Sequence, residues 1–167
     1  RAACRWGVFY ALQGGGLSLA GMAARLGADV GALGHLLAFL QQEAYLRQTA
    51  AGDYELTATG DELRSTHPDG WHYVCLLWGG EHMAAWQHLD EAIRTGESSF
   101  EALYGCGYFE YLDRNPKLLV EYQRAMRAYA LRDYAELPQA LDWGQHGAVM
   151  DVGGGYGAAL ECLQKAY

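Results

Sequence analysis

The hydrophobic residues in the first part of the chain recur every three or four positions, which is the spacing of one helix face. This pattern predicts helices over Arg1–Gln13, over Leu19–Leu26 and from Val30 to about residue 44. Ser18 and Asp29 precede the second and third helices, and each can accept a hydrogen bond from a free backbone N–H as an N-cap. The glycines that follow the first two segments are typical helix ends.

Two short β-prone segments follow, on either side of Ala51–Asp53, and they predict a hairpin. Thr57 is then predicted to begin a short helix that reaches Leu63. The order of helix, turn, helix and hairpin is that of a winged helix domain.

The second half of the chain has the pattern of several helices and one strand. Proline opens the longest of these helices, where its missing N–H costs nothing. The paired glycines Gly79-Gly80 predict a bend in the first of these helical stretches. The predicted segments are a bent helix over 71–94, short helices around 100–104 and 108–113, a long helix from Pro116 to about Glu136, a strand over Ala148–Val152 and the start of a last helix.

Composition and charge exclude several classes of protein. The 167 residues are about half apolar, with a formal charge of −8, which argues against a protein that neutralises phosphates. The predicted helix over 30–44 has no Lys or Arg, so we do not expect it to read DNA or RNA. No apolar run has the length of a membrane span. The four cysteines have neither zinc-site nor redox spacing, so we expect no metal and a reducing, cytoplasmic setting.

Asp151–Gly157 reads D-V-G-G-G-Y-G and lies between the predicted strand and the last helix. Glycines permit positive φ angles and let a ligand touch the backbone. The pattern G-x-G-x-x-A, with Ala158 as its third small residue, fits a dinucleotide site. Asp151 and Gly157 instead favour the form D-x-G-x-G-x-G. A glycine-rich turn without a ligand is the third interpretation.

The form D-x-G-x-G-x-G resembles motif I of class I S-adenosylmethionine-dependent methyltransferases. Upstream, G-D-Y-E-L-T-A-T-G from Gly52, W-Q-H-L-D-E-A-I-R-T-G from Trp86 and E-Y-Q-R-A-M from Glu121 follow one another in the order found in one family. The whole chain is similar to the small-molecule O-methyltransferases of plant phenolic and bacterial polyketide or carotenoid pathways. Tyr122 and Gln123 stand where that family usually has Phe and Asn.

The resemblance implies a mainly α fold with two domains joined by connecting helices. A winged-helix-like dimerisation domain would occupy residues 1–96, and connecting helices on the substrate side would occupy 97–141. Residues 142–167 would be the first βα unit of a truncated Rossmann-like α/β methyltransferase domain. It also implies a homodimer and a chain that is an incomplete portion of the enzyme, unless a partner chain supplies the missing half.

The same resemblance assigns site residues. The expected cofactor is S-adenosyl-L-methionine, and the expected substrate is a hydroxylated aromatic or polyketide-type small molecule of secondary metabolism. The catalytic base is expected beyond Tyr167. The cofactor residues would be Asp151, Gly153, Gly155 and Met126, and the substrate residues Tyr108, Phe109 and Tyr122.

Other polar and aromatic residues have simpler interpretations. Arg124 and Arg127 flank Met126 and either are solvated or hold a carboxylate, and solvation is favoured. The six histidines lack metal-site spacing and are expected to be ordinary surface or core residues. Trp86 is expected to be structural.

Two alternatives to a methyltransferase stay open. The same scaffold can carry non-methylating chemistry, such as hydroxylation or decarboxylation, because a fold does not fix a reaction. The chain can also be a non-catalytic dimerisation module.

Overall fold

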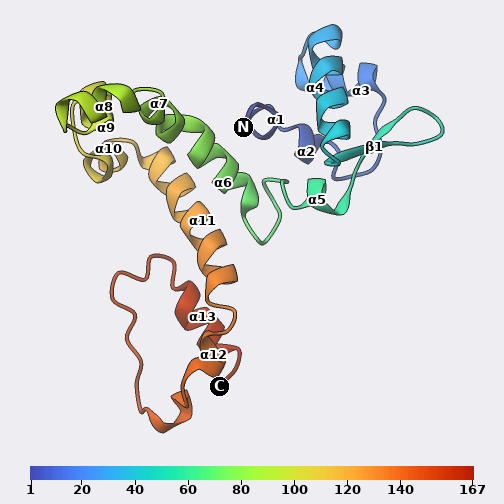
Figure 1. The fold of residues 1–167 in the computed structure, drawn as a ribbon. Helices are drawn as coiled ribbons and strands as arrows, with labels where there is room; N and C mark the ends of the chain where they lie inside the picture. The colour runs from blue at the N-terminus through green and yellow to red at the C-terminus, as the bar shows by residue number, and fades with distance from the viewer. The chain divides into compact units, whose positions relative to one another are not determined.

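The computed structural model describes all 167 residues, and they form two compact units, Arg1–Leu76 and Leu77–Tyr167 (Figure 1). The fold is mainly helical, with one two-stranded sheet, as the sequence predicts. The expected domain boundary after residue 96 lies inside the second unit, and the division into three functional parts stays a prediction.

The first unit consists of short helices and one hairpin. The predicted helix over Arg1–Gln13 is wrong as a single element, because Gly7 takes a left-handed φ of 74° and divides it in two. The elements are α1 (Ala2–Arg5), α2 (Val8–Ala11), α3 (Leu19–Leu26), α4 (Val30–Gln42), β1 (Leu46–Gln48), β2 (Tyr54–Leu56), α5 (Ala58–Asp61) and α6 (Trp71–Leu77), which ends at the unit boundary.

The predicted helix caps of α3 and α4 are confirmed. Ser18 Oγ accepts a hydrogen bond from the Gly21 N–H at 3.1 Å, and Asp29 Oδ1 accepts one from the Ala32 N–H at 2.8 Å. Between them these helices bury Met22 and Leu37 completely. Taken singly, none of the helices has the length and apolar character of a bilayer span; α3 and α4 reach it only when counted together, across a bend of 115°.

The predicted hairpin is also confirmed. β1 and β2 are antiparallel, with Leu46 opposite Leu56. Thr57 caps α5, accepting a hydrogen bond from the Gly60 N–H at 3.1 Å. A Cβ on Gly60 would lie 2.0 Å from the backbone oxygen of Tyr45, so α5 packs on the chain before the hairpin at a distance that only glycine allows.

The second unit is a series of helices (Figure 1). The predicted bend at Gly79-Gly80 is confirmed. η1 is a π-helical turn in which the backbone of Gly80 is not helical, with a φ of −101° and a ψ of −125°. The elements are η1 (Trp78–His82), α7 (Met83–Trp86), α8 (Leu89–Thr95), α9 (Ser99–Tyr104), α10 (Tyr108–Arg114), α11 (Pro116–Asp133), α12 (Leu137–Ala140), η2 (Trp143–Gln145) and α13 (Ala158–Gln164).

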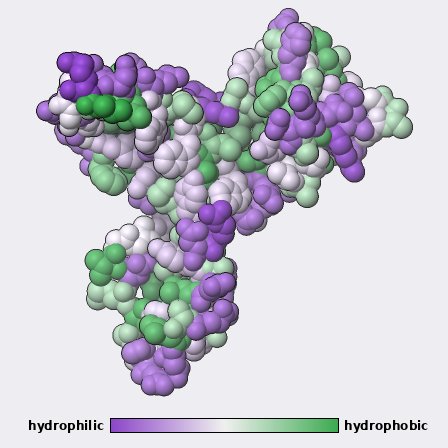
Figure 2. Space-filling view, viewed as in Figure 1, coloured by the Kyte–Doolittle hydropathy of each residue, from purple (hydrophilic) through white to green (hydrophobic).

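The predicted strand over Ala148–Val152 is not formed. A strand takes its backbone hydrogen bonds from a neighbouring strand, and the only sheet of the chain is the hairpin of the first unit. The apolar side chains of this segment are therefore not covered, and Met150 and Val152 are 85% and 87% exposed. Figure 2 shows apolar surface, in green, on the part of the chain that Figure 1 draws in orange and red.

Candidate functional site

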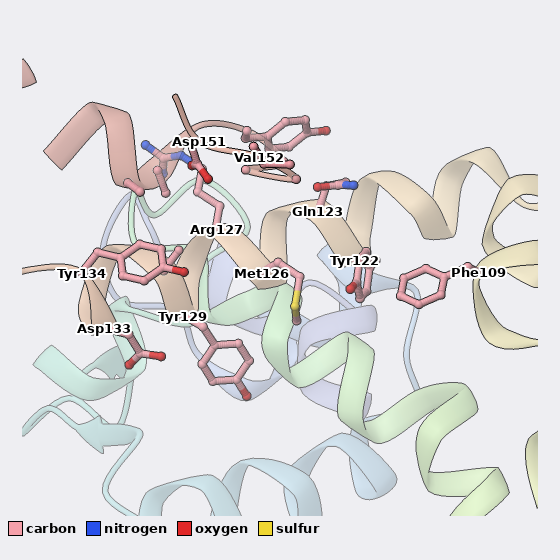
Figure 3. Close-up of a pocket in the computed structure, with 17 residues that line it drawn as sticks. Phe109, Tyr122, Gln123, Met126, Arg127, Tyr129, Asp133, Tyr134, Asp151 and Val152 are labelled. Atoms are coloured by element: carbon pink, nitrogen blue, oxygen red, sulfur yellow. The ribbon is translucent and has the colours of Figure 1, made fainter. Parts of the chain in front are cut away.

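A cavity of about 590 Å³ lies within the second unit, between the glycine loop and one face of α11 (Figure 3). Its volume is in the range of small-molecule sites, which is roughly 300–1,000 Å³. Its lining consists of Phe109, Tyr122, Gln123, Met126, Arg127, Tyr129, Ala130, Asp133, Tyr134, the loop residues 151–156, Ala158 and Ala159.

The α11 side of the cavity follows from helical spacing. Tyr122, Met126, Tyr129 and Asp133 are separated by four, three and four positions, so they lie along one stripe of the helix. A second, neighbouring stripe begins at Gln123 and continues every three or four residues. The two stripes place sulfur, aromatic rings, amide and carboxylate on the same surface.

The glycine loop forms the facing side, and its backbone needs glycine for two different reasons. Gly153 and Gly155 have φ angles of 75° and 54°, which side chains disfavour. Gly154 instead lies under Asp151, whose Oδ2 would be 2.2 Å from a Cβ at that position. A Cβ on Gly155 would lie 2.9 Å from Oε1 of Gln123, so the loop is also close to α11.

The cavity brings together most of the residues that the sequence singles out. Asp151, Gly153, Gly155 and Met126, expected at the cofactor, share it with Phe109 and Tyr122, expected at the substrate. Their roles stay predictions.

Tyr108 is the one expected site residue that does not line the cavity. Its ring meets the ring of Tyr122 edge-on, with 5.7 Å between centroids, and that of Phe109 at 5.9 Å. Burial raises the pKa of the Tyr108 phenol, and the nearby carboxylate of Glu81 raises it further, so the phenol stays protonated. Tyr108 thus contacts two of the lining rings, although it does not line the cavity itself.

His82 extends the aromatic cluster on the other side of Tyr108. Its ring lies 4.9 Å from the Trp78 ring and 4.7 Å from the Tyr108 ring, and its Nδ1 is buried without a hydrogen-bond partner. Burial lowers the pKa of the imidazole, because the charged form is poorly solvated there. Trp78 also supports the cavity, since its indole N–H donates to Tyr129 Oη at 2.7 Å.

Arg127 is ion-paired, so the favoured prediction of a solvated arginine is wrong for this residue. Its Nη2 lies 2.6 Å from Oε2 of Glu161 on α13, and Lys165 Nζ lies 2.8 Å from the other oxygen of the same carboxylate. Hydrogen bonds lower the pKa of Glu161, the larger effect coming from Lys165 and the smaller from Arg127, so the Glu161 carboxylate stays charged. Arg124 is exposed.

The charges that line the cavity favour a cationic or neutral ligand over a phosphate. The lining holds two carboxylates, Asp133 and Asp151, and one guanidinium, Arg127, which already has Glu161 as a partner. A pyrophosphate would need cations or free donors to offset its charge. The dinucleotide interpretation of the glycine loop therefore has little support from this geometry.

Comparison with known proteins agrees with this geometry. A family model described as the O-methyltransferase domain matches residues 86–167, which contain α11 and the glycine loop. These residues are therefore similar to the O-methyltransferase domain family. The chain is also 35% identical, over 145 residues, to 3-amino-4-hydroxybenzoate 4-O-methyltransferase of Streptomyces cremeus, and it covers 40% of that protein.

Solved structures extend the likeness over nearly the whole chain. The crystal structure of LaPhzM matches 99% of this chain with a TM-score of 0.92 and 25% identity, and the match covers 50% of LaPhzM. An O-methyltransferase from neocarzinostatin biosynthesis, solved with S-adenosyl-L-homocysteine and 1,4-dihydroxy-2-naphthoic acid, matches with a TM-score of 0.74 and 28% identity, over 51% of its length. The chain thus spans about half the length of these proteins, or less.

Several cavity residues were not found by sequence reasoning. Gln123 and Tyr129 lie three positions on either side of Met126, so extending the helical spacing from Met126 would have found them. Gly154 is a variable position of the loop motif, and no signal in the sequence marks its contact with Asp151.

Proposed function

We propose that the protein carrying this chain is an S-adenosylmethionine-dependent O-methyltransferase that acts on a hydroxylated aromatic or polyketide-type small molecule of secondary metabolism. The observation that carries the proposal is the shared cavity, where the glycine loop faces the aromatic and thioether side chains of α11. The relative from Streptomyces cremeus, named for 4-O-methylation of an aminohydroxybenzoate, supports the substrate class.

The residues of the cavity suit a sulfonium nucleoside. Asp151 offers a carboxylate to a polar or cationic part of the ligand, while Gly153 and Gly155 let the ligand approach the backbone. Met126 and Tyr122 provide an apolar, polarisable surface opposite the loop. When bound, S-adenosylmethionine supplies the methyl group that an acceptor oxygen takes.

On the substrate side, the chain supplies a flat aromatic surface. Phe109 and Tyr122 line the cavity, and the ring of Tyr108 packs against both of them. Such rings hold a planar acceptor by stacking and edge contacts, each worth about 0.5–1.5 kcal/mol beyond buried area. Their contribution to catalysis is to orient the acceptor oxygen.

The first unit is proposed to be a winged-helix dimerisation domain, and the protein a homodimer. In the first unit, two capped helices are followed by a hairpin and a short helix, and this order supports the assignment. The second unit is proposed to contain the start of a Rossmann-like domain, in which residues 148–152 pair with further strands. The four cysteines are free thiols, which fits a cytoplasmic enzyme.

Calorimetry with S-adenosyl-L-homocysteine, using the natural protein that carries this sequence, tests the cofactor. We expect saturable binding that Asp151→Asn weakens. Asp113→Asn, on the exposed side of α10 and away from the cavity, is the matched control and should bind normally. Absence of binding by the unmodified protein rejects the proposal.

The mass of the product separates methyl transfer from its alternatives. An acceptor that gains one methyl group excludes a hydroxylase or decarboxylase built on the same scaffold. A dimer in sedimentation that binds neither S-adenosylmethionine nor its demethylated product would instead indicate a dimerisation module without catalysis.

A further inference from the structure

Two polar side chains, one helical turn apart on α11, lie against the segment that contains the glycine loop and the helix after it. They are Gln123 and Arg127, which are spaced by four positions and therefore point in nearly the same direction. Figure 3 shows both on the loop side of α11, with Arg127 extending toward Asp151.

Gln123 lies against the loop itself. Its Oε1 would be 2.9 Å from a Cβ on Gly155, so the amide occupies the space beside the Gly155 Cα. Gly155 has a left-handed φ of 54°, a conformation that glycine adopts readily, and its lack of a Cβ lets the Gln123 amide lie this close to the backbone.

Arg127 reaches past the loop to the helix that follows it. Its guanidinium lies 2.6 Å from Oε2 of Glu161, one turn into α13, and both side chains are only partly exposed. The N–H of Glu161 donates to the carbonyl of Gly157 at 2.9 Å, and the N–H of Gly157 donates to the carbonyl of Gly154 at 2.8 Å. A chain of contacts thus connects Arg127 to the turn of the loop.

We propose that Gln123 and Arg127 are positioning residues that form a two-point clamp: Gln123 on Gly155 and Arg127 on Glu161 hold the glycine loop in its ligand-binding shape before the ligand arrives. The statement about the ligand rests on the proposed function, but the clamp itself is a property of the ligand-free protein. Preorganisation of this kind strengthens binding because less ordering remains to be done when the ligand binds.

Hydrogen–deuterium exchange of the ligand-free natural protein tests the clamp directly. The reporter is the Gly157 amide, which is protected by its hydrogen bond to Gly154. In Arg127→Met and in Glu161→Gln we expect this amide to exchange about twofold to fivefold faster, the range for one partly exposed ion pair. Amides of α6 should be unchanged.

A double-mutant cycle and two further variants separate the clamp from other roles. If the pair acts as one unit, Arg127→Met combined with Glu161→Gln exchanges no faster than the faster of the two single variants. Arg127→Lys should restore much of the protection, and Gln123→Ala should reduce it independently. Lys117→Met, at an exposed position of α11 away from the cavity, is the control and should match the unmodified protein.

The same variants are then titrated with S-adenosyl-L-homocysteine. We expect the dissociation constant to rise by the factor seen in exchange, and the double variant to bind no more weakly than the weaker-binding of the two single variants. Unchanged exchange at Gly157, or effects on binding that add in the double variant, overturns the clamp, because additivity would make Arg127 a direct ligand contact. Lack of binding by the unmodified protein overturns the proposed function alone.

Discussion

Replacing Gly155 by alanine adds one methyl group at the point where the glycine loop meets α11, and its cost has two separable parts. The first is backbone strain, because alanine in a left-handed conformation costs about 1–2 kcal/mol. The second is contact with Gln123, whose Oε1 would lie 2.9 Å from the new carbon. Gly157 supplies the matched control, since its φ of 73° gives the same strain while no atom lies within 4 Å of its added methyl.

The magnitude follows from these two parts. Backbone strain that must be restored on binding weakens affinity by roughly fivefold to thirtyfold, and both alanine variants share this loss. At Gly155 the Gln123 side chain must also leave its rotamer, at a cost of about 0.5–1.5 kcal/mol, which is a further twofold to tenfold. Gln123→Ala removes the contact. The double variant Gln123→Ala/Gly155→Ala should therefore bind with the same affinity as the double variant Gln123→Ala/Gly157→Ala.

Calorimetric titration with S-adenosyl-L-homocysteine measures all of these variants on one scale. We expect Gly155→Ala to bind several-fold more weakly than Gly157→Ala, and the difference to vanish when Gln123 is alanine. Equal affinities of the two glycine variants in the presence of Gln123 would refute the argument, because the contact at 2.9 Å would then have no energetic effect.

Three further predictions concern the first unit. Gly60→Ala should destabilise the first unit by about 3 kcal/mol or more in urea unfolding, because the new Cβ would lie 2.0 Å from the backbone oxygen of Tyr45, which cannot rotate away. The control Gly34→Ala, inside α4 and facing only the flexible side chain of Leu19, should be neutral or slightly stabilising. Leu37→Ala should cost about 2–5 kcal/mol in the same assay, and a smaller loss would mean that the fully buried site collapses around the cavity. Burial lowers the pKa of His72, so the unfolded chain takes up the proton first, and the free energy of unfolding should fall as the pH drops below about 6.5. His72→Gln should lose that part of the slope, and an unchanged slope would contradict the assignment.

Much of the helical architecture is encoded locally, which is why the sequence predicts it. Ser18 and Asp29 cap helices through hydrogen bonds to residues three positions away, and Gly80 bends a helix wherever that helix packs. The spacing of Met126 and Tyr122 on one helix likewise places both on the surface that becomes the cavity wall. These features depend on neighbours along the chain, so tertiary contacts are not needed to infer them.

The remaining features depend on residues far apart in sequence. Ala148–Val152 has the composition of a strand but forms none, because a strand needs a partner that local sequence cannot supply. The ion pair of Arg127 with Glu161 spans 34 positions, and Gln123 lies 32 positions before Gly155, which it approaches (155 − 123 = 32). The sequence by itself determined which helix and which loop carry the chemistry; only the packing of α13 and the loop on α11 decided which side chains meet, because that depends on the free energy of tertiary packing and not on any local preference.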